Sequence, residues 1–275
     1  MNMTGEPPPR QECYVDGYDR KQGTCRVYDS RGNQIYQSEY VDDKLEGKLT
    51  KWDYASNIKL EENYHNNLLH GVRTVYYRNG QKEYELEYKE GVENGYMKRL
   101  RENGKKEEFY NYKEGKKEGR CLRWYDNGII CADVEYKGDK VIKVKSLRDD
   151  QGRDCILSEE DIVVYKAGIT ADNTFVYISI LVPKEANRVT PVNFKESSAI
   201  KSRIQFGTVT EIVDKQGKRY KTACSHLHYT KIIYSVGNTV TPNRFDDNLL
   251  TECSYGIHVV KFRDQCQNWV PVDSL

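Results

Sequence analysis

Aromatic and aliphatic residues alternate with polar ones along the first half of the chain, in short runs separated by turn-forming residues. Within residues 71–94, the segments 75–77 and 84–88 alternate with a period of two, which is typical of a half-buried β-strand and not of a helix. Two turn signals in each such copy leave room for two strands of about seven or eight residues. The pattern therefore predicts β-hairpins that follow one another along the chain.

This pattern returns with a fixed period of 24 residues. A glycine opens each copy, at Gly23, Gly47, Gly71, Gly95 and Gly119. A tyrosine column keeps the same period at Tyr40, Tyr64, Tyr88, Tyr112 and Tyr136. A second column consists of Tyr28, Trp52, Tyr76, Leu100 and Trp124. A constant spacing of this length indicates a tandem repeat architecture.

Each copy has two places where the chain is expected to turn. The first is an Asn-Gly pair at 79–80, 103–104 and 127–128, with residues 31–32 and 55–57 in its place in the earlier copies. We expect type I′ turns at these pairs, because both residues tolerate a positive φ. The second place follows the tyrosine column by three residues, at Asp43, Asn67, Gly91, Gly115 and Asp139. These residue types reach the left-handed region at low cost.

Joined in this way, the five copies predict an elongated antiparallel β-hairpin ribbon. Ten strands would give a ribbon roughly 45–50 Å long. We expect the glycine that opens each copy to make room for an aromatic ring from a neighbouring hairpin.

The second half of the chain has a different pattern, because the period ends after Tyr136. Residues 175–182 form a continuous apolar run, as in a buried strand. Further strands are expected at 203–213, 219–224, 229–236 and 255–262, with a short helix at 263–270. The fold class is therefore mainly β, with the ribbon followed by a compact β-rich α+β domain. The predicted divisions are a Pro-containing arm at 1–22, the repeats at 23–142, a connector at 143–160 and the second domain at 161–275.

The repeat pattern can be written G-x4-[Y/W]-x2-N-G-x7-Y-x2-[G/N/D] over residues 23–142, and it resembles MORN repeats. It is closest to the variant with the Asn-Gly turn, as in the segment YKEGKKEG at 112–119. Ser56 replaces the turn glycine of the second copy, and Asp43 and Asn67 replace the later one. The first two hairpins are therefore expected to be less regular than the others.

The C-terminal part carries a second resemblance. The segments YSVGNTVTPNRFDDN at 234–248 and TECSYGIHVVKFRDQ at 251–265 are similar to a C-terminal module of large nucleocytoplasmic DNA viruses. The combination with the repeats looks most like the repeat proteins of the marseillevirus group. The resemblance implies a virion-associated or minor capsid component, located in the virion and in the host cytoplasm during assembly. It implies no particular chemistry.

Composition narrows the possible partners. The chain has 275 residues and a net charge of +1, from 43 basic and 42 acidic residues, so no overall field favours nucleic acid. No run reaches the 18 or so apolar residues of a transmembrane segment, and the start lacks the apolar core of a signal peptide. The eight cysteines have no framework spacing, and we expect reduced thiols. Cys25 and Cys121 share an apolar repeat column with Leu49 and Met97.

One group of residues in the second half is a candidate for chemistry: Cys224, His226, His228, Cys253 and His258. Zinc binds cysteine and histidine in tetrahedral sites, but these spacings are not those of a common zinc finger. A Cys-His nucleophile pair is a further alternative, with Cys253 or Cys224 as thiolate. We expect Cys253 to be buried and inert, because Tyr255 and Ile257 share its strand face while His258 points to the other face. No P-loop, GxSxG or GxGxxG motif is present, so we expect no catalytic residue, cofactor or metal.

The aromatic columns are the candidate interaction or packing residues. Tyr28, Trp52, Tyr76 and Trp124 would form a ladder of large, stiff rings on one face of the sheet, while the tyrosine column from Tyr40 to Tyr136 packs along the ribbon. We therefore expect a non-enzymatic structural or interaction protein that binds other proteins, of the capsid or virion, through its ribbon and arm. Two alternatives stay open: an enzyme that uses Cys253 and His258 with the repeats for targeting, and a peripheral membrane adaptor. The oligomeric state is not defined by the sequence.

Overall fold

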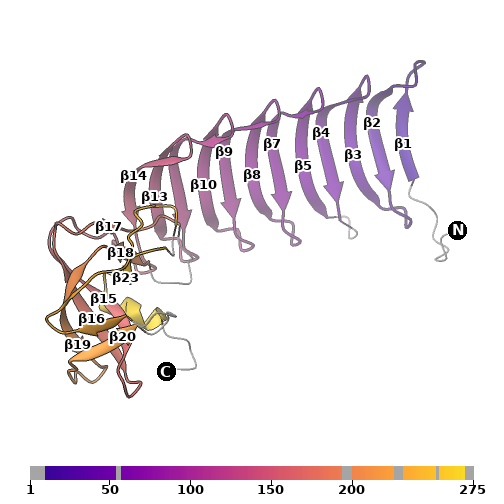
Figure 1. Ribbon diagram of the computed structural model, residues 1–275. Helices are drawn as coiled ribbons and strands as arrows, with labels where there is room; N and C mark the ends of the chain where they lie inside the picture. The colour runs from indigo at the N-terminus through magenta and orange to yellow at the C-terminus, as the bar shows by residue number, and fades with distance from the viewer. Residues whose placement is uncertain (1–9, 54–56, 194–199, 226–231, 252–253, 270–275) are drawn as a thin grey trace. The chain divides into compact units, whose positions relative to one another are not determined.

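The computed structural model describes residues 10–53, 57–193, 200–225, 232–251 and 254–269. The chain divides into two compact units, Met1–Lys143 and Val144–Leu275 (Figure 1). Each unit consists of β-strands, and the described residues contain one short 3-10 helix, η1 (Arg263–Trp269). No described helix has the length and apolar character needed to cross a membrane. The mainly β fold class is therefore confirmed.

The repeats form one antiparallel sheet in which sequential strands pair with one another, as Figure 1 shows. The short strands β6 (Leu68–Leu69) and β11 (Lys116–Lys117) pair with β5 and β10 at the edge of the sheet. The main path is β1 (Arg10–Val15), β2 (Lys21–Tyr28), β3 (Gln34–Val41), β4 (Lys44–Trp52), β5 (Ile58–His65), β7 (Gly71–Tyr76), β8 (Lys82–Lys89), β9 (Val92–Leu100), β10 (Lys106–Lys113), β12 (Gly119–Trp124), β13 (Ile130–Lys137) and β14 (Lys140–Leu147). This confirms the predicted elongated hairpin ribbon.

The Asn-Gly pairs do turn the chain, but the expected type I′ geometry is wrong. In the third copy only Gly80 has a positive φ, of 83°. Its N–H bonds to the carbonyl of Tyr77, and the N–H of Tyr77 bonds to the carbonyl of Gln81. The loop thus has five residues, and the glycine alone carries the left-handed conformation. Asn79 has another role: its side chain accepts from the N–H of Gln81 at 2.9 Å and donates to the carbonyl of Glu102, in the next loop, at 3.0 Å.

The second set of turns has the geometry that was expected of the first. At each of them two successive residues have a positive φ, as a two-residue type I′ hairpin requires. The pairs are Asp42 and Asp43, Asn66 and Asn67, Glu90 and Gly91, Glu114 and Gly115, and Gly138 and Asp139. The left-handed conformation predicted after each column tyrosine is therefore confirmed, and the preceding residue shares it.

The glycines that open each copy have a positive φ within or beside a strand. The side chain that lies closest to Gly95 is not the aromatic ring that was predicted. Gly95 has a φ of 125°, and it pairs directly with Tyr112 of its own hairpin. A Cβ atom added at Gly95 would lie 2.9 Å from Cβ of Glu87 on β8, and closer still to its carboxylate. The close neighbour from the adjacent hairpin is thus a carboxylate side chain and not an aromatic ring. The sequence period could not tell which side chain approaches the glycine, because the aromatic columns and the column that contains Glu87 all repeat every 24 residues.

We expect Gly95→Val to lower the free energy of unfolding by about 1–3 kcal/mol, because it adds a clash with Glu87 to a strained backbone. Gly119→Val is the matched control, since Gly119 also has a positive φ, of 78°, but no atom within 4 Å of the added Cβ. Denaturant titration followed by fluorescence would measure both. Equal losses in the two variants would show that contact with Glu87 costs nothing.

The two aromatic columns lie on opposite faces of the sheet. Side chains alternate along a strand, and the pairing register places Leu49, Leu86 and Cys121 on the same face as the tyrosine column. We call this the tyrosine face; it contains most of the buried apolar side chains of the ribbon. The other face is called the tryptophan face, and it contains Tyr28, Trp52, Tyr76, Leu100 and Trp124.

The ribbon begins earlier than the expected boundary at residue 23. Residues 10–15 form strand β1, which pairs with β2 after a loop at 16–20. Asp16 organises this loop by accepting from the N–H groups of Tyr18 and Arg20 and pairing with the Arg20 guanidinium. The predicted arm at 1–22 is therefore too long, and its proline run lies outside the described residues.

The first two strands also correct the expectation of reduced thiols. Cys13 and Cys25 are directly paired in the register of β1 and β2, with their Cα atoms 4.3 Å apart, and they form a disulfide. Cys25 is buried, as its repeat column predicted, and so is Cys121, which is a free thiol.

The loop pattern continues past the predicted end of the repeats. Asp149 follows Tyr125 by one full period, and the N–H of Asp149 bonds to the carbonyl of Arg153, as in the five-residue loops of the ribbon. Gly152 has the corresponding positive φ, of 82°. The predicted connector at 143–160 is therefore not a separate linker. The second unit includes most of it, with Leu147, Cys155 and Leu157 buried.

The second unit contains a six-stranded sheet and a three-stranded sheet. Its largest core cluster includes Val164, Ile178, Ile180, Ile212 and Val259. In order across the first sheet the strands are β21 (Ile233–Ser235), β20 (Thr222–Ser225), β15 (Ile162–Ile169), β16 (Phe175–Val182), β19 (Gly207–Val213) and β22 (Thr239–Val240). The three-stranded sheet consists of β17 (Arg188–Val189), β18 (Ser202–Ile204) and β23 (Ile257–Val259).

Several sequence predictions for this unit can now be compared with the strands. The strand predicted at 175–182 coincides with β16. The predicted strand at 203–213 is divided into β18 and β19, which belong to different sheets. The strand predicted at 219–224 overlaps β20, which pairs with β15 and not with β19. The predicted helix at 263–270 is the 3-10 helix η1.

A buried arginine explains part of the C-terminal sequence motif. Arg203 is 0% exposed, and its guanidinium donates to the carbonyls of Asp246, Asn248 and Thr251. Gly256 has a φ of 143°, and a Cβ atom there would lie 3.1 Å from Cβ of Arg203. The glycine of the motif thus gives this arginine its space, which is a structural role.

Candidate functional site

The tryptophan face brings together the four rings that the sequence singled out. Tyr28, Trp52, Tyr76 and Trp124 are half-buried, so each ring keeps part of its surface accessible. Charged side chains border the rings: the ammonium of Lys106 lies 5.6 Å from the Trp124 ring, and Tyr76 donates to Glu61 at 2.6 Å. Burial and this carboxylate raise the pKa of Tyr76 to about 12. The face therefore presents aromatic surface within a polar border.

The tyrosine column lies on the opposite face, together with most of the buried apolar side chains of the ribbon. Tyr136 is buried, and the ammonium of Lys21 lies 5.1 Å from the Tyr40 ring. Tyr64 donates to Glu62 at 3.0 Å, and Glu62 is itself buried against Arg73 at 3.0 Å. The Glu62–Arg73 ion pair joins β5 to β7 of the neighbouring hairpin. The two columns, which were one set of candidates in the sequence, thus have different surroundings.

The cysteine and histidine group is only partly described. Cys224 lies on β20, where its thiol donates to the carbonyl of Ile169 at 3.5 Å, and His258 lies on β23 opposite Arg203. His226, His228 and Cys253 lie outside the described residues, so the burial predicted for Cys253 stays a prediction. Within the described ranges no three His, Cys, Asp or Glu side chains are placed to hold a metal ion.

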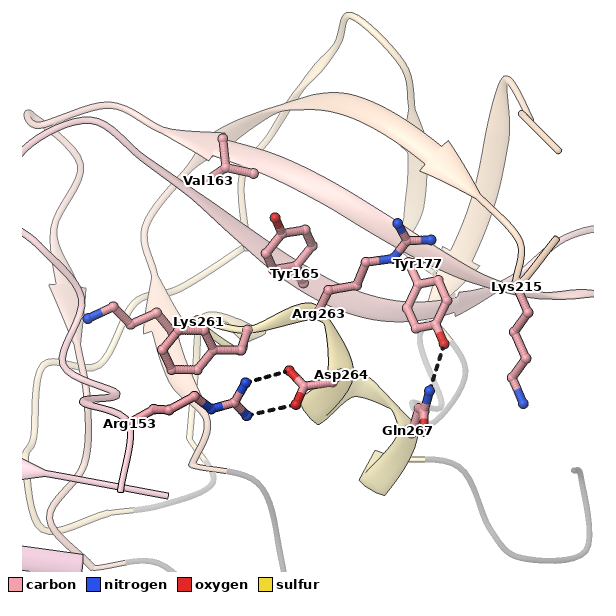
Figure 2. A pocket seen from close by; sticks show the side chains of 10 residues that line it. Arg153, Val163, Tyr165, Tyr177, Lys215, Lys261, Arg263, Asp264 and Gln267 are labelled. Carbon is pink, nitrogen blue, oxygen red and sulfur yellow. Dashed lines mark hydrogen bonds and ion pairs between the residues drawn. The ribbon is translucent and has the colours of Figure 1, made fainter. Parts of the chain in front are cut away.

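A basic, aromatic hollow lies on the second unit, and the sequence did not predict it. It has a volume of about 790 Å³ and opens widely to solvent (Figure 2). The strands β15 and β16 contribute Tyr165 and Tyr177, and η1 contributes Arg263 and Gln267. Val163 of β15 and Asp264 of η1 also line it, and three further segments contribute Arg153, Lys215, and the pair Lys261 and Phe262.

On one side of the hollow the charges neutralise each other. Arg153 forms a two-bond ion pair with Asp264, at 3.1 and 2.7 Å, which Figure 2 shows, and its Nε donates to Asp149 at 2.7 Å. These carboxylates raise the pKa of Arg153, and the guanidinium lowers the pKa of Asp264. Lys261 pairs with Asp154 at 3.4 Å and donates to the carbonyl of Ile156 at 2.7 Å. On this side of the hollow each cation is therefore paired with at least one carboxylate.

The other side carries cations that lie against aromatic rings. The Arg263 guanidinium lies 4.3 Å from the centre of the Tyr177 ring, and the Lys215 ammonium 5.8 Å from that of Phe175. Phe175 and Tyr177 meet edge to face at 5.1 Å. The Tyr177 hydroxyl accepts from Gln267 at 3.2 Å, as Figure 2 shows. The row from Arg263 to Lys215 is called the cation–aromatic row below.

Sequence reasoning missed this hollow because its residues come from segments that are far apart in the chain. Arg153, Tyr177, Lys215 and Arg263 have no common motif or spacing. The one local signal was the alternation in β15 and β16, which places Tyr165 and Tyr177 on a shared face of the sheet. Only the folded second unit brings the cations to these rings.

A buried lysine lies elsewhere in the second unit. Lys166 is 5% exposed and donates to the carbonyl of His258 at 3.1 Å. Burial lowers its pKa from 10.5 to about 8, with a smaller opposing effect of Cys266 and a further lowering by Lys201. Burial also raises the pKa of the Cys266 thiol to about 12. Lys166 is not among the residues that line the hollow, and we assign it a structural role.

The depressed pKa of Lys166 predicts a pH dependence of stability. Between about pH 8 and 10.5 the unfolded lysine holds a proton that the folded one has lost, so stability gains from this group as the pH rises. Lys166→Met is expected to stabilise the protein at pH 7, by up to about 3 kcal/mol, and this advantage should shrink across that window. The raised pKa of the Cys266 thiol makes stability fall as the pH rises, which opposes the effect of Lys166. The unfolding titrations are therefore made in a Cys266→Ala background, which lacks this thiol. A constant difference between pH 7 and 10.5 would contradict the assignment.

Comparison with known proteins adds one family match. Residues 153–266 match the model of a family described as "Family of unknown function (DUF5758)", which covers most of the second unit. No curated protein matches the chain.

Among solved structures, the chain is similar to one in the "Crystal structure of GtfA/B complex bound to UDP and GlcNAc". The identity is 15% and the TM-score is 0.21, over 47% of this chain and 24% of that chain. This chain thus spans about a quarter of the length of that one. Such a likeness carries no argument about fold or function.

Proposed function

We propose that this protein is a non-enzymatic interaction protein that binds other proteins through the tryptophan face of its repeat ribbon. The observation that carries the proposal is the placement of Tyr28, Trp52, Tyr76 and Trp124 on one face of a single-layer sheet. Large aromatic rings with a polar border are typical of recognition surfaces, because they offer contact area with few rotatable bonds. The repeat makes that surface extended and regular, which suits a partner that is itself extended or repeated.

The sequence resemblances to MORN repeats and to a viral C-terminal module give the proposal its most concrete form. In that form the partner is a capsid or internal virion protein, and this chain is a minor structural component. Cys253 lies outside the described residues, and no contact among the described residues favours a membrane adaptor, so neither alternative is proposed as a second function.

Site-specific crosslinking tests the interaction surface. A photoreactive phenylalanine analogue at Tyr76 or Trp124 is expected to crosslink to a defined partner protein during particle assembly. Tyr88 and Tyr64, on the tyrosine face, are the matched positions, and we expect much weaker crosslinking from them. Equal crosslinking from both faces, or none from the tryptophan face, would contradict the proposal.

Mass spectrometry of purified particles tests the virion role separately. The protein is expected to remain with the particles after a high-salt wash, in a constant ratio to the major capsid protein. Its absence from washed particles would overturn the virion role, while the crosslinking result would still decide whether the tryptophan face binds protein.

A further inference from the structure

We propose that the hollow of the second unit binds an acidic, extended peptide segment of a partner protein. Arg263 and Lys215 would hold its carboxylates on the cation–aromatic row. This site is distinct from the tryptophan face, and it does not depend on the proposed function of the ribbon.

The first step concerns the cations. Arg153 and Lys261 are held by Asp149, Asp264 and Asp154, so their charges are already compensated. Arg263 and Lys215 form no ion pair within the described part of the chain and lie instead against Tyr177 and Phe175. A guanidinium stacked on a ring keeps its outer N–H groups directed away from it, in the planar arrangement that matches a carboxylate.

The second step concerns the rings. Tyr177 is buried and anchored by Gln267, and Phe175 packs against its edge, so the platform beneath the two cations is firm. Such an arrangement holds the charged groups in place before a ligand arrives, which lowers the entropic cost of binding. Tyr165 and Val163 continue the lining along β15 and offer apolar contact to the aliphatic part of a bound segment.

The third step distinguishes a peptide from a nucleic acid. Asp149, Asp154 and Asp264 compensate Arg153 and Lys261, so the uncompensated positive charge of the hollow is limited to Arg263 and Lys215, which is too little for a backbone with a charge at every unit. A peptide carries separated carboxylates with neutral amides between them. Its amide groups can also bond to polar groups such as those of Tyr165 and Gln267, which line the same hollow. The open shape accommodates an extended chain that enters and leaves at the surface (Figure 2).

Fluorescence anisotropy with the full-length protein tests this site. The probe is a labelled peptide of alternating glutamate and glycine, and its control has glutamine in place of each glutamate. Arg263→Gln and Lys215→Gln are each expected to weaken binding of the glutamate peptide by about tenfold. Binding should also weaken as salt is raised, because the contacts are solvent-exposed.

The chain offers a matched control for each variant. The guanidinium of Arg244 lies 5.4 Å from the Tyr255 ring, and the ammonium of Lys218 lies 5.0 Å from the Tyr220 ring, and neither lines the hollow. Arg244→Gln and Lys218→Gln remove the same charges from similar aromatic contacts in the same unit. We expect both to leave peptide binding unchanged within a factor of about two, since they lie outside the site.

Three outcomes would overturn the proposal. The glutamine peptide could bind as well as the glutamate peptide, or the control variants could weaken binding as much as Arg263→Gln. A labelled oligothymidylate could bind more tightly than the peptide with the same dependence on Arg263 and Lys215, which would make the hollow a nucleic-acid site. Crosslinking from the tryptophan face is a separate readout, so failure here leaves the proposed function of the ribbon to its own test.

Discussion

Arg203→Ala is expected to lower the free energy of unfolding of the second unit by about 3–5 kcal/mol, the scale for removing a buried charged donor from its partners. The guanidinium is 0% exposed and joins β18 to the carbonyls of Asp246, Asn248 and Thr251. Its loss leaves these acceptors without their donor and opens a cavity under the loop that carries them. Thermal and denaturant unfolding of the full-length protein would measure the loss.

Two further variants define the cause of that loss. Arg203→Lys keeps the charge but not the planar set of donors, and we expect an intermediate effect. Arg188 also donates to backbone carbonyls, those of Ser158, Glu160, Pro183 and Ala186, but it is half-buried. Arg188→Ala should therefore cost about 1 kcal/mol, since water can replace its contacts. A loss at Arg188 as large as that at Arg203 would show that burial of Arg203 is not what matters.

The second large effect is expected from deletions in the ribbon. Removing residues 72–95 takes out one full period and joins Gly71 to Tyr96, which occupies the same column as Val72. Each hairpin contacts only its neighbours, so the remaining hairpins should stack with the same pairing register. We expect this variant to fold, with a somewhat lower melting temperature and strong hydrogen-exchange protection in β5 and β9.

Removing residues 78–89 takes out half a period, namely one loop and β8. β9 would then have to pair antiparallel with β7, and Gly71 would lose its paired tyrosine, Tyr88. The repeat columns on the two sides of the junction no longer match. We therefore expect β7 and β9 to lose hydrogen-exchange protection, and a second unfolding transition to occur at a lower temperature. If both deletions unfolded alike, the period would not be the folding unit of the ribbon.

The sequence predicted the ribbon well because its signals are local. Alternation in segments such as 84–88 sets the strand, and residues such as Asp43 and Gly91 set the left-handed turn that follows. Its errors also have a local cause. The Asn-Gly pair is compatible with two turn geometries, and in the five-residue loop only the glycine is left-handed, while the Asn79 side chain bonds to the next loop. Residues at both ends of the array match the 24-residue pattern weakly, so the sequence did not predict β1 or the loop at Asp149.

The sequence by itself thus determined the period, the strands, most turns and the division into two parts, since these follow from backbone preferences and side-chain alternation. Only the tertiary structure decided which residues meet across that framework. It placed Glu87 at Gly95, Arg203 beneath the loop near Asn248, and Arg263 on Tyr177. The contacts of Arg203 and Arg263 join segments far apart in the chain, whereas Glu87 and Gly95 lie on adjacent strands. The energies of all three contacts depend on packing and desolvation at sites that exist only once the sheets have formed.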